Sequence, residues 1–263
     1  MSDKQKVVAI LPSRIESSRL PRKALLDICG LPMIVHVFKR CLLAKKLDEV
    51  YVATDSNEIK EVVEKYGGKA IMTSSEHQTG TDRIAEASNN IDAEIIVNVQ
   101  GDEALVNPQY IDKVVNELLE NPDINVAILV NPYFKKNSPS DIKVVLNNNN
   151  DVLYLSRSDI PSNSRTKCPS SLKAYHILPF RKEFLLEYSQ WEKGTLEQIE
   201  FNEYLRILEY GHRIRAVHVE SDAISVDTED DLEFVRKKMR SDPWLQKYMS
   251  TRFGEYRDSS NAK

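Results

Sequence analysis

The chain has 263 residues, of which 41% are hydrophobic and 29% are charged, and its formal net charge is -4. This composition is typical of a globular protein, and the mildly acidic balance argues against a protein that coats nucleic acid or an anionic membrane. We expect no transmembrane helix, no signal peptide and no disulfide framework, and hence a cytoplasmic protein, because the apolar runs are short and the three cysteines are scattered.

The first half of the chain alternates short apolar runs with helical patterns. Strands are predicted at residues 7–11, 49–54, 70–72 and 94–99, and helices at 33–43, 57–66, 82–88 and 108–120. Such alternation is typical of βαβ units and a parallel sheet. We therefore expect an α/β fold with a doubly wound, mostly parallel sheet over residues 6–130. Ligands of such sheets bind beyond the carboxyl ends of the strands.

The second half has a different pattern. Strands are predicted at 124–130, 142–146, 152–155 and 213–220, helices at 180–189, 198–210 and 228–238, a hairpin loop at 147–150 and a surface loop at 162–171. The sequence contains no internal repeat, and no clear linker separates the two halves. We expect one domain over residues 1–263, with a core of 6–130 and 200–240 and an inserted β-rich lobe of 131–199.

A basic loop follows the first predicted strand. It contains the cations Arg14, Arg19, Arg22 and Lys23 but no glycine between Pro12 and Lys23. Cations, hydroxyls and backbone amides are the groups that bind a triphosphate, although an ordinary solvated loop is the alternative. The missing glycines exclude both the P-loop and the dinucleotide-binding fingerprint, and therefore argue against a dinucleotide-dependent dehydrogenase.

Two aspartates are candidates for a metal site. Asp102 follows the strand that ends near Val99, and Asp227 directly precedes a predicted helix. Each could instead be a turn or cap residue. Together they suit Mg²⁺, which proteins commonly hold with one or two carboxylates plus substrate phosphates.

A glycine-centred turn, HQTGTDR at 77–83, leads into another predicted helix. The free amides of a helix N-terminus suit an anion or the edge of a base. The alternative is an ordinary capped loop.

Several blocks resemble one family. These are LPSRIESSRLPRKALLDICGLPMIVHV (11–37), VATD (52–55), HQTGTDR (77–83), VNVQGDE (97–103), IKVVL (142–146), YLSRSDIP (154–161), LEQIEFNEYLRILEYG (196–211) and VDTEDDLEFVR (226–236). In sequence and order they resemble the CMP-Kdo synthetases, the 3-deoxy-manno-octulosonate cytidylyltransferases. The resemblance implies a Rossmann-like nucleotidyltransferase fold, CTP as donor, a small sugar acid as acceptor, Mg²⁺ as cofactor, and a homodimer built through the lobe.

The resemblance also implies roles for individual residues. Catalytic roles fall to Arg14, Lys23 and Asp102, and the metal pair is Asp102 and Asp227. The nucleotide-binding residues are Arg14, Ser17, Ser18, Lys23, Gly80, Thr81, Asp82 and Arg83. The sugar-binding candidates are Gln100, Arg157, Tyr175, His176, Glu197 and Glu200.

The chain departs from the family pattern where a histidine and a tyrosine usually face the sugar. Those positions hold Ala174 and Leu178, and Tyr175 and His176 are neighbours that could compensate. The acceptor alternatives are therefore an 8-amino-3,8-dideoxy-manno-octulosonate or a sialic-type acid. A non-catalytic CTP-binding protein is the alternative of another class.

Overall fold

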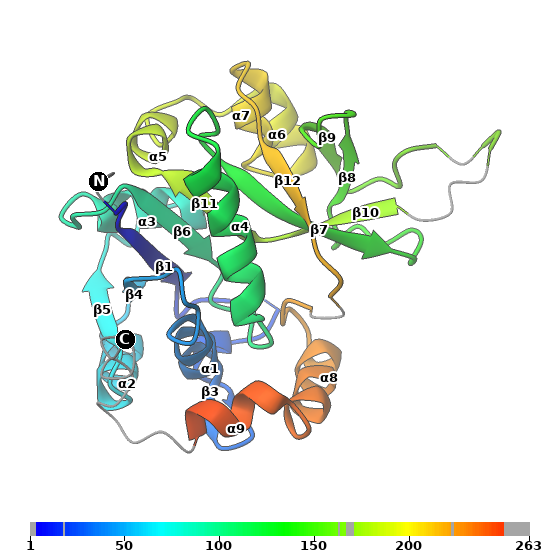
Figure 1. Ribbon diagram of the computed structural model, residues 1–263. Helices are drawn as coiled ribbons and strands as arrows, with labels where there is room; N and C mark the ends of the chain where they lie inside the picture. Colours follow the sequence, from blue (N-terminus) through cyan, green and yellow to red (C-terminus); the bar gives the residue numbers. More distant parts are fainter. Residues whose placement is uncertain (1–3, 18, 163, 167–170, 222–223, 250–263) are drawn as a thin grey trace. The chain divides into compact units, whose positions relative to one another are not determined.

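The computed structural model describes residues 4–17, 19–162, 164–166, 171–221 and 224–249, which form an α/β protein as predicted (Figure 1). The chain divides into two compact units. We call residues 6–93, 98–112 and 223–263 the N-terminal unit, and residues 1–5, 94–97 and 113–222 the β-rich unit. The single-domain description with a lobe at 131–199 stays a prediction.

The N-terminal unit contains a parallel sheet. Its strands are β1 (Val7–Ser13), β4 (Glu49–Thr54), β5 (Lys69–Met72) and the end of β6 (Ile95–Val99), a strand that the two units share. Their order is β6-β1-β4-β5, and β4 runs parallel to both β1 and β5. Every residue of β1 is buried, which explains its unbroken apolar sequence.

The N-terminal unit also contains helices, of which α1, α2 and α3 contact this sheet. They are α1 (Met33–Cys41), α2 (Asn57–Lys65), α3 (Gly80–Ser88), α8 (Glu229–Met239), α9 (Pro243–Met249) and the short η1 (Lys23–Leu25), with a small hairpin of β2 (Asp27–Ile28) and β3 (Leu31–Pro32). Helix α8 begins as predicted at the cap residue Thr228, whose Oγ1 accepts a hydrogen bond from Asp231 N at 3.2 Å. An apolar cluster that includes Leu20, Val226 and Leu232 packs α8 against the loop after β1.

The β-rich unit is built on a second, mainly antiparallel sheet. Its elements are β7 (Ala127–Tyr133), β8 (Lys143–Leu146), β9 (Val152–Ser156), β10 (Ser171–Tyr175), β11 (Ile177–Arg181), β12 (Arg215–His218), α5 (Lys182–Tyr188), α6 (Thr195–Glu200) and α7 (Leu205–Glu209). The strand order of this sheet is β12-β7-β10-β8-β9, whereas β11 is hydrogen-bonded to β6 of the other sheet. Residues 147–150 connect β8 to β9 as the predicted hairpin loop. Helix α4 (Pro108–Glu120) crosses from one unit to the other in sequence.

Three predictions in the second half were wrong. The sheet expected over residues 6–130 does not include β7, which belongs to the second sheet. The single helix expected at 198–210 is two helices, because Phe201 adopts a left-handed conformation with φ 48° and ends α6. The helix expected from Phe180 starts at Lys182, because residues 177–181 form β11.

Strand β10 and helix α9 were not predicted at all. Among the described residues, no helix is both long and apolar enough to cross a membrane.

Candidate active site

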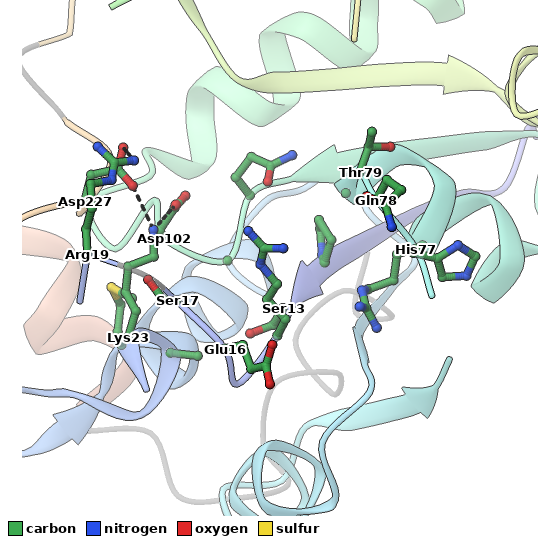
Figure 2. A pocket seen from close by; sticks show the side chains of 18 residues that line it. Ser13, Glu16, Ser17, Arg19, Lys23, His77, Gln78, Thr79, Asp102 and Asp227 are labelled. Carbon is green, nitrogen blue, oxygen red and sulfur yellow. Dashed lines mark hydrogen bonds and ion pairs between the residues drawn. The ribbon is translucent and has the colours of Figure 1, made fainter. Parts of the chain in front are cut away.

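A pocket of about 280 Å³ lies in the N-terminal unit at the carboxyl ends of β1 and β6 (Figure 2). The predicted residues that line it are Arg14, Ser17, Lys23, Gly80, Arg83, Gln100, Asp102 and Asp227. Thr81 and Asp82 are not among its lining residues, and Ser18 lies outside the described residues. The structure thus brings the basic loop, the glycine-centred turn and both aspartates to one cavity.

Lys23 lies between the two predicted metal carboxylates. Its Nζ donates to Asp102 Oδ2 at 2.6 Å and to Asp227 Oδ1 at 3.0 Å (Figure 2). Arg19 adds a second cation, with Nη2 at 3.1 Å from Asp227 Oδ2. Two carboxylates and two cations therefore balance one another at one end of the pocket.

The protonation of this group follows from its surroundings. Burial lowers the pKa of Lys23, but the charges and hydrogen bonds of Asp102 and Asp227 outweigh burial and raise that pKa above its ordinary value. Burial likewise raises the pKa of Asp227, but Lys23 and Arg19 outweigh it, so the pKa of this carboxyl is lowered. Lys23 is therefore an ammonium and Asp227 a carboxylate at neutral pH.

Backbone contacts fix the two aspartates as neighbours. Val226 N donates to Asp102 O at 3.2 Å, although 125 residues separate Asp102 from Asp227 in the sequence. The backbone N–H of Asp227 donates to Asp231 Oδ2 at 3.1 Å, within the cap of α8. Gly101 allows the chain before Asp102 to lie close to the end of β1, because a Cβ at residue 101 would lie 2.8 Å from Pro12 O.

The turn before α3 forms another wall of the pocket. Thr79 Oγ1 accepts from Asp82 N at 3.1 Å and so caps the helix. Arg83 is buried and already paired, with Nη2 at 2.7 Å from Asp55 Oδ2 and Nη1 at 2.6 Å from Thr73 Oγ1. Thr81 is fully buried, and its Oγ1 accepts from Asn98 Nδ2 at 3.5 Å. Arg83 and Thr81 thus hold the turn in place through contacts within the protein.

Gln100 lines the pocket opposite Gly80 and has a defined orientation. Its Nε2 donates to Asn98 Oδ1 at 3.1 Å. A Cβ on Gly80 would lie 3.3 Å from that Nε2 and 3.4 Å from Oε1. A small residue at 80 therefore leaves room for the Gln100 amide.

The pocket residues fit a divalent cation. Asp102 and Asp227 both direct an oxygen at one point, which the Lys23 ammonium holds. Carboxylate oxygens are the ligands that Mg²⁺ prefers, and substrate phosphates usually complete its shell. Within the part of the chain that the structure describes, no group of three or more His, Cys, Asp or Glu side chains is arranged to hold a metal. A cation here would therefore need ligands from the substrate as well as from the protein.

The remaining sugar-binding candidates belong to the β-rich unit, where most of them bond to other protein groups. Arg157 donates from Nε to Glu200 O at 2.9 Å, from Nη1 to Pro139 O at 2.7 Å and from Nη2 to Phe201 O at 3.1 Å. Glu200 in turn accepts from Ser156 Oγ at 2.6 Å and from Arg157 N at 2.9 Å. This network ties β9 to the end of α6.

Glu197 forms a buried, two-point ion pair with Arg206. Glu197 Oε1 and Oε2 lie 2.6 and 2.7 Å from Arg206 Nη2 and Nε, and both side chains are nearly inaccessible to solvent. Tyr175 is buried, and His176 stacks on Tyr204 with ring centroids 6.0 Å apart. Glu197 is therefore bound to a structural partner.

Comparison with known proteins identifies relatives that are cytidylyltransferases, in agreement with a pocket that suits a nucleotide. The sequence model of the family described as cytidylyltransferase matches residues 8–214. A 3-deoxy-manno-octulosonate cytidylyltransferase from Syntrophus aciditrophicus is 42% identical, over 88% of this chain and 96% of its own. One from Escherichia coli is 40% identical, over 89% and 96%.

A solved structure is similar as well. CMP:2-keto-3-deoxy-manno-octonic acid synthetase in complex with CTP is 40% identical, with a TM-score of 0.86 over 89% of this chain and 98% of that one. The chain belongs to the 3-deoxy-manno-octulosonate cytidylyltransferase family. A cytidylyltransferase from Leptospira borgpetersenii, 18% identical with a TM-score of 0.64, shares the fold.

Membership of this cytidylyltransferase family confirms three predictions. The family, the α/β fold class and the class of enzyme, a CTP-dependent nucleotidyltransferase, were all expected from the sequence. Cytidylyltransferases generally depend on a metal ion, which agrees with the two carboxylates in the pocket. The roles of individual residues stay predictions.

The pocket also contains residues to which the family resemblance assigned no individual role. They are Pro12, Ser13, Glu16, Arg19, Ala24, Met33, His77, Gln78, Thr79 and Gly101. Arg19 was visible as one cation of the basic loop, and residues 77–79 belonged to the glycine-centred turn. Neither pattern alone could reveal that Arg19 pairs with Asp227.

Proposed function

We propose that this cytidylyltransferase transfers CMP from CTP to the anomeric hydroxyl of 3-deoxy-manno-octulosonate and releases pyrophosphate. It would do so with Mg²⁺, as a cytoplasmic homodimer, and its product would serve lipopolysaccharide assembly. The observation that carries the proposal is the convergence of Lys23, Asp102 and Asp227 in a pocket bordered by the basic loop. The named relatives, about 40% identical along nearly their whole length, support the choice of acceptor.

The chemistry is an in-line attack of the sugar hydroxyl on the α-phosphorus of CTP. The hydroxyl oxygen forms a bond to the α-phosphorus and its proton passes to solvent, while the bond from the α-phosphorus to the bridging oxygen breaks and pyrophosphate leaves with that oxygen. Arg14 and Lys23 line the pocket and would neutralise the charge that develops on pyrophosphate. Much of the rate enhancement would come from holding donor and acceptor in line.

Four further pocket residues have proposed tasks. Ser17 and the backbone of the loop after β1 would donate hydrogen bonds to phosphate oxygens, and Gln100 would orient the acceptor. Asp102 and Asp227 would hold Mg²⁺, which when bound supplies positive charge beside the reacting phosphate.

One observation favours a second candidate for the acceptor. Ala174 and Leu178 are buried, with 1% and 0% of their surfaces exposed, and neither carries a polar group. A site that lacks polar partners for a substrate hydroxyl discriminates less strongly against analogues in which that hydroxyl is missing or replaced. The second candidate is therefore the same reaction on 8-amino-3,8-dideoxy-manno-octulosonate or a sialic-type acid.

A non-catalytic CTP-binding protein is the alternative of a different kind. The described pocket is lined by Arg14, Lys23, Asp102 and Asp227, the groups that the proposed transfer would use. A protein that only binds CTP would have no use for two carboxylates in contact with a lysine at the phosphate end.

The test is pyrophosphate release from CTP and Mg²⁺ with 3-deoxy-manno-octulosonate, its 8-amino analogue or a sialic acid in parallel reactions. Release with the plain sugar is the expected result. Release only with another acid would retain the mechanism and change the substrate. CTP binding without release in any reaction would support the non-catalytic alternative.

A further inference from the structure

Lys23 occupies the point where the two carboxylates meet. Its Nζ lies 2.6 Å from Asp102 Oδ2 and 3.0 Å from Asp227 Oδ1, and the Lys23 side chain is only 17% exposed. Mg²⁺ binds oxygen at about 2.0–2.1 Å. A cation shared by these two oxygens would lie within the space that the ammonium fills, so the two cannot occupy it together.

Electrostatic repulsion also prevents the metal ion and the Lys23 ammonium from binding together between the two carboxylates. Lys23 and Arg19 already compensate the charges of Asp102 and Asp227. A metal ion and the Lys23 ammonium are both positive, and at contact distance they would repel each other strongly in a partly buried site. A metal ion that entered alone would have to displace the ammonium, and the other carboxylate that lines the pocket, Glu16, is a single exposed group instead of the pair that Lys23 contacts now.

The position of Lys23 in the chain makes an exchange possible without a change of fold. Lys23 begins the short helix η1, where its backbone O accepts from Leu26 N at 3.2 Å. Its four-carbon side chain can rotate while this backbone stays in place. Other lining residues, among them Ser13, Arg14 and Ser17, surround the space into which the ammonium can move.

We propose that Lys23 holds the metal position in the nucleotide-free protein and transfers to a phosphate when CTP and the metal bind together. This inference rests on the proposed function of the pocket. The triphosphate provides the anion that accepts Lys23, and the vacated carboxylates accept the metal. Metal and nucleotide therefore promote each other's binding by the same factor.

The test measures binding of Mn²⁺, a spectroscopic substitute for Mg²⁺, by the loss of the electron paramagnetic resonance signal of the free ion. It uses the full chain, with and without a CTP analogue that has a methylene group between the α- and β-phosphorus and so cannot react. In the unaltered protein the analogue should tighten Mn²⁺ binding at least tenfold, within the usual range of such coupling.

Removal of the lysine should break that coupling. Lys23→Met should bind Mn²⁺ alone about tenfold more tightly than the unaltered protein, and the analogue should add little further affinity. Lys23→Gln, which retains a polar side chain of similar length, should behave in the same way and serves if the methionine variant folds poorly. Unchanged or weaker binding of Mn²⁺ alone in a folded variant would overturn the proposal.

Two control variants test whether the change in Mn²⁺ affinity arises at Lys23 and the aspartates it contacts. Arg22→Met removes a cation of the same loop that pairs with Glu58 and does not line the pocket, so it should leave Mn²⁺ binding unchanged. Lys23→Met combined with Asp102→Asn should lose the tight Mn²⁺ site, because one of its two ligands is gone. Tight binding that persists in the double variant would place the ion elsewhere and refute the exchange.

The two proposals fail in different ways. Pyrophosphate release with no effect of Lys23→Met on Mn²⁺ would refute the exchange alone. Coupled binding of Mn²⁺ and nucleotide, without pyrophosphate release from CTP in the presence of any sugar acid, would refute the proposed reaction alone.

Discussion

The charged residues of the two units are used in different ways. In the N-terminal unit, the carboxylates of Asp102 and Asp227 remain 23% and 33% exposed and share one lysine at the edge of a pocket. In the β-rich unit, the Glu197–Arg206 pair is only 6% and 3% exposed. Charges that open onto a cavity can change partners when a ligand arrives, whereas a desolvated pair is fixed because separation leaves an uncompensated buried charge.

The largest expected effect on activity comes from removing one of the two carboxylates that contact Lys23. Asp102→Asn retains the size of the side chain but removes the charge beside Lys23. Pyrophosphate release should fall by about 10³-fold, comparable to the loss of one strong electrostatic group at a reacting centre. The circular dichroism spectrum and thermal midpoint should change little. Normal turnover in the variant would show that Asp102 is not part of the reaction.

The opposite pattern is expected for the buried pair. Glu197→Gln leaves Arg206 without its ion-pair partner and should lower the free energy of unfolding by about 3–5 kcal/mol in urea titrations. The matched control is Asp123→Asn, which breaks an exposed pair with Arg213 and should have no measurable effect. If Glu197→Gln instead raised the KM for the sugar at full stability, Glu197 would be a substrate ligand as the sequence predicted.

A fixed polar group also occurs in the N-terminal unit, away from the pocket. His36 is fully buried; its Nε2 lies 2.6 Å from Ile28 O, so this nitrogen carries the proton, and Nδ1 accepts from Tyr248 OH at 2.6 Å. Burial lowers the pKa of His36 to about 4, the nearby Arg40 adds to this effect, and the bond to Ile28 O opposes it.

The lowered pKa of His36 should make unfolding depend on pH. The unfolded chain takes up this proton near pH 6.5 and the folded one near pH 4, so stability is complete above pH 6.5 and about 3 kcal/mol is lost as the pH falls to 4. Urea titrations between these values should show the slope. His36→Gln should remove this component, whereas replacement of the exposed His218 by glutamine should retain it. An identical slope in both variants would contradict a neutral, buried His36.

The smallest expected effect concerns the shape of the pocket. Gly101→Ala would bring a Cβ within 2.8 Å of Pro12 O, which is backbone and cannot turn aside. We expect a loss of about 1–3 kcal/mol in stability and a lower kcat, because Asp102 is the next residue. Gly80→Ala meets only the Pro12 ring and the Gln100 amide at 3.2–3.4 Å and should cost less. Urea titration and pyrophosphate release should rank the two variants, and the reverse order would contradict this geometry.

Sequence patterns predicted the N-terminal unit better than the β-rich one, for physical reasons. An unbroken apolar run such as residues 7–11 has few alternatives to a buried strand, and Thr228 with Asp231 is a strong local start signal for a helix. The break at Phe201 has no such signal, because neither glycine nor proline is present to mark a left-handed residue. The Phe201 side chain is 82% exposed, and the neighbouring contacts that the structure shows include hydrogen bonds from Arg157 to the backbone carbonyls of Glu200 and Phe201.

The candidate site shows the same limit. The motif blocks were sufficient to predict a basic loop and two aspartates near one nucleotide, and the pocket gathers them. They could not show that the Arg157 guanidinium donates to three backbone carbonyls, because every residue has a backbone carbonyl and the sequence does not mark which ones accept. Side-chain partners depend on segments that are distant in sequence.

The backbone hydrogen bond between Val226 and Asp102 has a consequence for synthesis of the protein. Lys23 and Asp102 leave the ribosome early, but Asp227 is added 125 residues after Asp102. At typical elongation rates this is a delay of about 6–25 s. During that interval a nascent chain carries Lys23 and Asp102 without Asp227, so the contact of Lys23 with both carboxylates can form only after residue 227 has been added.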